Sequence, residues 1–321
     1  MLQLPDFKGK NVVIIRSAKG EAFTNLKLKN ENLTLVKDEK IVNQISIHKI
    51  FAIFAVGEMS FTTTLTRKLM HNGVSTFFLK PNLETYASIE AEAAGNYVLR
   101  QRQYQFKDDL NFAKNLVKNK SYNQLSLLWE KCPEFFKDKT RHAVYKKICQ
   151  KIDEAKTLNE LLGMEGNFTK NYFQAYFEPL KWYKRMPRTK VDTTNLLMDI
   201  GYTMLFNFID SLLRLHGCDT YKGIYHQLFF QRKSLSCDLM EPFRCIIERT
   251  ILKAHNLGQI ETKDFQQYKG KYSLKFDQNK KYMELFLEEI MKEKTEIFSY
   301  IKQFYFCILN ETQDYPFYKH K

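Results

Sequence analysis

The stretch from Lys222 to Arg249 contains side chains suited to hold a divalent cation. His226 is followed twelve residues later by Asp238, and Glu241 comes three positions after that. If the backbone there is helical, residues three apart project from one face, so both carboxylates would face the same site. The same spacing is common on solvated helices, where the acids would form only ion pairs. A metal site and a plain polar surface are therefore both open interpretations of this stretch.

The residues around these acids predict the helix that positions them. Apolar side chains recur with a helical period and indicate a buried face, made by Leu239, Phe243, Ile246, Ile247 and Ile251. A polar stripe points away from that face and consists of Asp238, Glu241, Arg244 and Glu248. Pro242 lacks the N–H that would bond the carbonyl of Asp238, so the helix must begin or bend nearby. The acids are thus expected at an irregularity in the helix.

Glu165 is the candidate for a third ligand. It stands in LLGMEGNF, between an amphipathic segment and the aromatic NYFQAYF. An acid there could simply favour a helix N-terminus. It could also approach His226 and Glu241 from another helix, as happens where helical proteins build metal sites from facing side chains.

Charge and composition favour a polyanionic partner. Fifty basic residues against thirty-six acidic ones give a net charge of +14, which suits nucleic acid, with a membrane surface as the competing partner. No apolar segment reaches the roughly 18 residues of a spanning helix, and the amino terminus does not resemble a secretion signal. We therefore expect a cytoplasmic protein without membrane association. The six cysteines lack metal-binding spacing and are expected to be reduced thiols, and no nucleotide-binding phosphate loop is found.

Basic residues gather in three short segments that could follow a DNA backbone. The first segment, KWYKRMPRTK, contains Lys181, Lys184, Arg185, Arg188 and Lys190. The others contain Arg100 with Arg102, and Arg232 with Lys233. Aromatic residues such as Trp182, Tyr183 and Tyr104 lie among them, which suits a groove that neutralises phosphates and stacks on bases. A solvated surface with core aromatics is the alternative interpretation.

The hydrophobic pattern predicts an α+β protein with a change of structure near residue 85. Residues 11–80 contain short apolar segments typical of strands, beginning with NVVIIRSAKGEAF at 11–23 and including a hairpin in LKLKNENLTLVK. One helix is expected there, in SFTTTLTRKLMHNGV. From Tyr86 onward the pattern is helical to the end of the chain. We therefore predict a β-rich domain at 1–85, followed by an all-helical catalytic domain at 86–321 that carries the metal site and the DNA-binding surface.

Taken in order, these motifs resemble the CRISPR-associated integrase family, the catalytic subunit of the spacer-acquisition machinery. The resemblance depends on MEG around Glu165, on PRTKVDTTNLLMDIGYTML, on GIYH ending at His226, and on CDLMEPFR with Asp238, Glu241 and Arg244. It extends to VGEMSFTTTLTRKLMHNGVSTFFL near the amino terminus and covers most of the chain.

The resemblance implies a site and a reaction. A Mg²⁺ or Mn²⁺ ion would be held by Glu165, His226 and Glu241, with Asp238 as a supporting acid and Arg244 on the scissile phosphate. The 3′-hydroxyls of a short DNA duplex would attack phosphodiesters at the edges of a CRISPR repeat, as part of an antiviral defence. The resemblance also implies a homodimer joined through the β-rich domain and a complex with the small CRISPR adaptation protein. A nuclease for branched DNA and a non-catalytic DNA-binding scaffold remain the alternatives.

Overall fold

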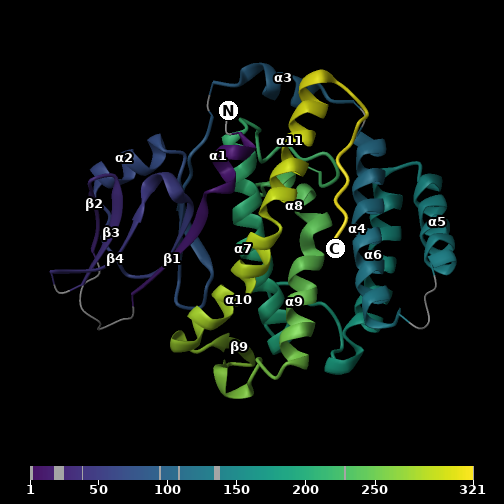
Figure 1. Ribbon diagram of the computed structural model, residues 1–321. Coiled ribbons are helices and arrows are strands. Elements are labelled where there is room, and N and C mark those ends of the chain that lie inside the picture. Colours follow the sequence, from purple (N-terminus) through teal and green to yellow (C-terminus); the bar gives the residue numbers. More distant parts are fainter. Residues whose placement is uncertain are drawn as a thin grey trace.

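The computed structural model has a β-rich amino-terminal part and a larger, mostly helical carboxy-terminal part (Figure 1). The predicted α+β class is therefore confirmed. The structure describes residues 3–17, 25–37, 39–93, 95–107, 109–133, 138–227 and 229–320.

The β-rich part contains two sheets. In the four-stranded sheet the order is β1-β5-β6-β7, with β5 parallel to both of its neighbours and β7 antiparallel to β6. The second sheet, β2-β3-β4, is antiparallel. The strands are β1 (Asn11–Ser17), β2 (Asn25–Lys29), β3 (Asn32–Lys37), β4 (Lys40–Ser46), β5 (Ile50–Gly57), β6 (Ser75–Leu79) and β7 (Thr85–Ile89). The predicted first strand continued to residue 23, and its part from residue 18 lies outside the described residues.

Two local predictions in this part are confirmed. The hairpin pairs Leu26 with Leu35 and turns at Asn30 and Glu31, whose φ angles of 49° and 58° are those of a tight hairpin turn. The predicted helix is α2 (Thr63–His71). Its first turn is capped by the Thr62 hydroxyl, which accepts a hydrogen bond from the Leu65 N–H at 3.1 Å.

Strand β5 joins the two parts of the molecule because it is buried on both faces, as its continuous apolar sequence IFAIFAVG requires. Ile50 and Ile53 pack on the side of the β2-β3-β4 sheet and α2. Phe51 and Phe54 belong to the core of the helical part, and the Phe51 ring lies 5.1 Å from that of Phe208. The sheet and the helices therefore share one core.

The amino terminus differs from the prediction of a single helix within the first 85 residues. A short helix, α1 (Leu4–Lys8), precedes β1. Its Phe7 is fully buried and stacks on Phe298 with 4.8 Å between ring centroids. The five-residue segment LPDFK is too short to show a helical period in the sequence, and its contacts with the core through Leu4 and Phe7 appear only in the fold.

The helices of the larger part surround one central element, α7. By length and composition, α7 contains an 18-residue window apolar enough to cross a membrane, so the expectation that no such segment exists was wrong. In this fold 83% of that window is buried inside the protein. These helices are α3 (Tyr97–Gln105), α4 (Asp109–Lys131), α5 (Asp138–Glu154), α6 (Leu158–Tyr176), α7 (Thr193–Leu215), α8 (Ser234–Met240), α9 (Arg244–Asn256), α10 (Asn279–Lys292) and α11 (Lys294–Asn310).

Two features differ from the predicted division into a β-rich and an all-helical part. The division at residue 85 falls on the first residue of β7, so the four-stranded sheet continues to Ile89. The helical part also contains a hairpin, β8 (Phe265–Tyr268) with β9 (Lys271–Leu274). Its turn at Lys269 and Gly270 has positive φ angles of 48° and 74°. Four-residue strands are too short to show a clear alternation in the sequence.

Candidate functional site

Glu165 and Glu241, far apart in sequence, meet at one buried lysine. Glu165 lies on α6, Glu241 begins the single-turn helix η4 (Glu241–Phe243), and Lys120 lies on α4. The Lys120 Nζ contacts Glu165 Oε1 and lies 2.7 Å from Glu241 Oε2. The lysine side chain is 7% exposed and that of Glu241 6%. The structure thus brings two of the three predicted ligands together, with an ammonium group between them.

The backbone breaks at Glu241 as Pro242 predicts. Helix α8 ends at Met240, η4 follows with a tighter turn, and α9 begins at Arg244. The break keeps Glu241 and Arg244 on one side, where an Arg244 guanidinium nitrogen lies 2.8 Å from Glu241 Oε1. Glu241 is therefore held by a cation on each of its oxygens.

The charges around Glu241 keep it ionised. Burial alone would raise the pKa of Glu241, but Arg244 and Lys120 outweigh burial and lower it to about 2. Burial likewise acts to lower the pKa of Lys120, and the charges of Glu165 and Glu241 raise it above its usual value instead. Glu241 and Lys120 are thus both charged at neutral pH.

His226 is fixed by Asp238, which is fully buried on α8. Asp238 Oδ1 lies 2.6 Å from His226 Nδ1, and its two oxygens accept hydrogen bonds from the backbone N–H groups of Ile224, Tyr225 and His226. A carboxylate can only accept here, so Nδ1 carries the proton. In the neutral ring, Nε2 then has a free lone pair for a metal.

Arg244 rests on a buried tyrosine and carboxylate network. Its guanidinium carbon lies 4.8 Å from the ring centroid of Tyr202. The hydroxyls of Tyr202 and Tyr172 donate to Glu248 at 2.8 and 2.7 Å. Burial raises the pKa of Glu248 even though both hydroxyls donate to it. The polar stripe predicted from the sequence therefore faces a polar interior.

The carboxy-terminal tail supports the same helices. Asn119 on α4 donates to the Tyr318 carbonyl and accepts from the Tyr318 N–H at 2.9 Å. One turn later, Asn123 accepts from the His320 N–H and donates to the Pro242 carbonyl, each at 2.9 Å. Figure 1 shows the tail running in extended form between α11 and α4. Lys120 and Glu241 thus lie on segments tied together by the tail.

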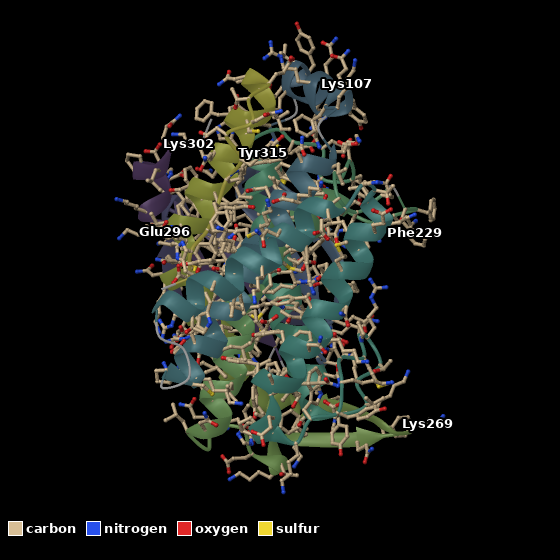
Figure 2. The ribbon with its side chains drawn as sticks, turned by 90° about the vertical axis from the view of Figure 1, so that its right-hand side faces the viewer. Lys107, Phe229, Lys269, Glu296, Lys302 and Tyr315 are labelled. Carbon is tan, nitrogen blue, oxygen red and sulfur yellow. The ribbon has the colours of Figure 1, made fainter. Side chains whose placement is uncertain are left out.

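A cavity of about 1430 Å³ opens beside the acids and contains many of the predicted DNA contacts. Lys120, Glu165, His226, Glu241 and Arg244 line it. Of the predicted DNA-binding residues, its other walls contain Lys184, Arg185, Arg188, Lys190, Arg232 and Lys233. Arg100, Arg102 and Lys181 do not line it. In Figure 2, Phe229, another lining residue, projects from the side of the molecule on which Lys269 marks the tip of the β8–β9 hairpin.

Several of the basic residues are already paired within the chain. Arg185 lies 2.5 Å from Asp199, and Lys233 lies 2.8 Å from the buried Asp210. Outside the cavity, Arg100 lies 3.7 Å from Glu92. Lys184 and Arg188, by contrast, are exposed at the cavity. A contact to phosphate is therefore expected more from Lys184 and Arg188 than from Arg185.

The side chains around Lys120 include the donor types that divalent metal ions use. Within the described parts of the chain, no three His, Cys, Asp or Glu side chains are gathered in a ready-made metal site. Glu165 and Glu241 nevertheless already share a cation, the Lys120 ammonium, and His226 is oriented by a carboxylate as metal-binding histidines commonly are. The residues therefore fit Mg²⁺ or Mn²⁺ by donor type.

Sequence reasoning missed Lys120 and the network behind Arg244. One signal for Lys120 was present. Within α4, the segment around it is polar on every face, and the buried residues include Asn119, Lys120, Ser121, Asn123 and Gln124. A long helix with no separate apolar stripe indicates polar contacts in the interior.

The chain is similar to known proteins over most of its length. The family profile described as CRISPR associated protein Cas1 matches residues 21–288. A CRISPR-associated endonuclease Cas1 from Thermodesulfovibrio yellowstonii is 28% identical over 257 residues, which cover 76% of this chain and 81% of the relative.

Two solved structures share the fold. A casposase bound to its integration product has a TM-score of 0.78 at 19% identity and covers 95% of this chain and 92% of its own. A Cas6-RT-Cas1–Cas2 complex has a TM-score of 0.79 at 24% identity and covers 98% of this chain. This chain spans 36% of that longer chain.

Proposed function

The chain belongs to the CRISPR-associated Cas1 family, and from that premise we propose that it is a metal-dependent DNA integrase with endonuclease activity. One observation carries the proposal: Glu165 and Glu241 share a cation at the wall of a basic cavity that His226 also lines. The acids that would bind the ion thus lie in the same cavity as basic side chains that would contact phosphate.

Glu165, His226 and Glu241 would hold the Mg²⁺ or Mn²⁺ ion. The bound ion would supply Lewis-acid polarisation of the scissile phosphate and a more acidic attacking hydroxyl. Asp238 keeps the proton of His226 on Nδ1, so that Nε2 would offer its lone pair to the ion. The three proposed ligands come from different elements: Glu165 from α6, Glu241 from η4 and His226 from the loop before α8.

Arg244 is suited to the scissile phosphate. Its Nε is a buried N–H without a hydrogen-bond partner among the described residues, while its terminal nitrogen is engaged by Glu241. Tyr202 supports its guanidinium from one side. A phosphate oxygen in the cavity would accept a charge-assisted hydrogen bond from the guanidinium N–H groups that Glu241 does not engage.

The reaction exchanges one phosphodiester for another. The 3′-hydroxyl at the end of a short duplex loses its proton and forms a new P–O bond at the edge of a CRISPR repeat. The P–O bond to the repeat's own 3′-oxygen breaks, and that oxygen takes up a proton. One bond forms for each that breaks, so the reaction needs no nucleotide hydrolysis.

The partners in this proposal are double-stranded DNA, a second copy of the chain joined through the β-rich part, and Cas2. The similar Cas6-RT-Cas1–Cas2 structure supports the last of these, and the casposase structure supports integration as the chemistry. The net charge of +14 supports a polyanionic substrate.

The direct test is strand transfer of a labelled duplex into a plasmid that carries a CRISPR repeat, in Mn²⁺. Glu165→Gln and His226→Ala should each reduce joined product at least about a hundredfold, because each removes a ligand from a site that needs all three. Glu178→Gln is the matched control, since that carboxylate lies just after α6 and is 77% exposed. Equal product from all four proteins would refute the proposal.

The two alternatives give different results in the same assay. A nuclease for branched DNA would cut the substrate without joined product, and its cutting would depend on Glu165. A DNA-binding scaffold would give neither product, and chelation of divalent ions would not change its DNA binding.

A further inference from the structure

The Lys120 ammonium occupies the place between two carboxylates that the proposed ion would need. It contacts Glu165 Oε1, and it lies 2.7 Å from Glu241 Oε2. The side chain is almost fully buried, and it lines the cavity together with His226 and Arg244. An ion held by both glutamates would therefore have to share this space with the lysine or displace it.

The positive charge of Lys120 balances the negative charges of Glu165 and Glu241 while no divalent ion is bound. Two carboxylates that face each other beside the cavity would repel. A single ammonium between them offsets that repulsion. Once a doubly charged cation arrives, the ammonium is a third positive group beside Arg244, and its presence opposes binding.

The lysine side chain can move without disturbing its helix. Asn119 and Asn123, which flank Lys120 on α4, are tied by hydrogen bonds to Tyr318, His320 and the Pro242 carbonyl. The backbone of α4 is thus anchored on both sides of the lysine. A lysine has four methylene groups and a compact head group, so its ammonium can swing into the adjoining cavity from a fixed backbone.

We propose that Lys120 is a built-in counter-cation: it holds Glu165 and Glu241 together while no divalent ion is bound, and it leaves them when an ion binds. This inference rests on the proposed metal-dependent function and names a residue that competes with the ion. Lys120 is a positioning residue in this proposal. Its effect appears in the affinity for the ion before any DNA is present.

The experiment measures Mn²⁺ binding to the full chain by electron paramagnetic resonance, without DNA. Lys120→Met keeps the length of the side chain and removes its charge, so Mn²⁺ should bind at least about tenfold more tightly than to the unchanged protein. Lys118→Met is the matched control. Lys118 lies on the same helix and pairs with Asp153 at 2.6 Å, away from the two glutamates, so its loss should leave the affinity unchanged.

The outcomes separate this inference from the proposed function. If Glu165→Gln abolishes Mn²⁺ binding but Lys120→Met binds no more tightly than the unchanged protein, the metal site stands and the counter-cation role is wrong. The proposed metal site is wrong if the unchanged protein binds no Mn²⁺, or if Glu165→Gln binds Mn²⁺ with the same affinity as the unchanged protein. In either case the counter-cation role of Lys120 is wrong as well.

A second measurement on the unchanged protein covers the case in which Lys120→Met fails to fold, as judged by circular dichroism. Lysine acetylation is followed by mass spectrometry with and without Mg²⁺. Lys120 should be acetylated faster when Mg²⁺ is present because its ammonium has left the buried ion pair, while Lys118 should not change. Equal acetylation of Lys120 in both conditions would overturn the inference.

Discussion

Asp238 holds both the ring and the backbone of His226. Its Oδ1 lies 2.6 Å from the ring Nδ1 and accepts a hydrogen bond from the His226 N–H at 2.9 Å, while its Oδ2 accepts from Ile224 and Tyr225. One fully buried carboxylate therefore determines the orientation of the imidazole and the path of the loop before it. Asp238 is placed to support His226 and does not itself line the cavity.

Asp238→Asn should weaken Mn²⁺ binding by about ten- to a hundredfold, which is the usual effect of losing such a supporting carboxylate. The amide replaces one acceptor oxygen by a donor, which cannot accept from the N–H groups that face it. Titration with Mn²⁺ measures the change. Asp277→Asn, on an exposed aspartate, serves as the control, and an affinity equal to that control would show that Asp238 does not orient the ring.

Arg188→Ala should reduce the salt dependence of DNA binding. If Arg188 neutralises one phosphate in the cavity, the slope of log affinity against log salt concentration should become shallower by about 0.9. Arg102→Ala removes the same charge outside the cavity, where Arg102 lies 3.6 Å from Glu311, and should leave the slope unchanged. Fluorescence anisotropy at several salt concentrations measures both, and equal slopes for the two variants would remove Arg188 from the DNA path.

Asn119→Ala should destabilise the protein by about 2 kcal/mol, because it leaves the N–H of the buried Tyr318 without its partner and removes one of the two amide donors to the Tyr318 carbonyl. Urea unfolding measures the free energy. Asn171→Ala, at an exposed position on α6, provides the comparison. A loss no larger than for Asn171→Ala would mean that the tail does not stabilise α4.

The stability of the protein should fall between pH 6.5 and pH 4 because of His320. Burial, followed by the charge of Arg249, lowers the pKa of His320 to about 4. The unfolded chain, in which the pKa is about 6.5, therefore binds a proton that the folded chain does not bind between these values, and stability present above pH 6.5 is lost as the pH falls.

The size of this effect can be measured with a variant. Between pH 7 and pH 5, the unchanged protein should lose about 2 kcal/mol more unfolding free energy than His320→Gln, which has no titrating group at that position. Urea unfolding at the two pH values compares them. The same loss in both proteins would show that His320 is protonated equally in the folded and unfolded states.

The sequence by itself determined the parts of the fold that local patterns encode. Four features follow from spacing and backbone chemistry within a few residues: the apolar segment of β5, the hairpin at Asn30 and Glu31, the end of α2 before Asn72, and the break at Pro242. Such signals are local because side-chain period and proline geometry act over one or two turns. The same reasoning identified Glu165, His226 and Glu241 as candidate ligands.

Only the tertiary structure decided what lies between those residues. Lys120 reaches Glu165 and Glu241 from a third helix, and the tail at Tyr318 fixes that helix through Asn119. Sequence periods and motifs do not predict which side chains on separate elements will touch, because such contacts depend on how whole helices pack. For that reason the sequence could suggest two acids for one cation, but only the packed helices placed a lysine between them.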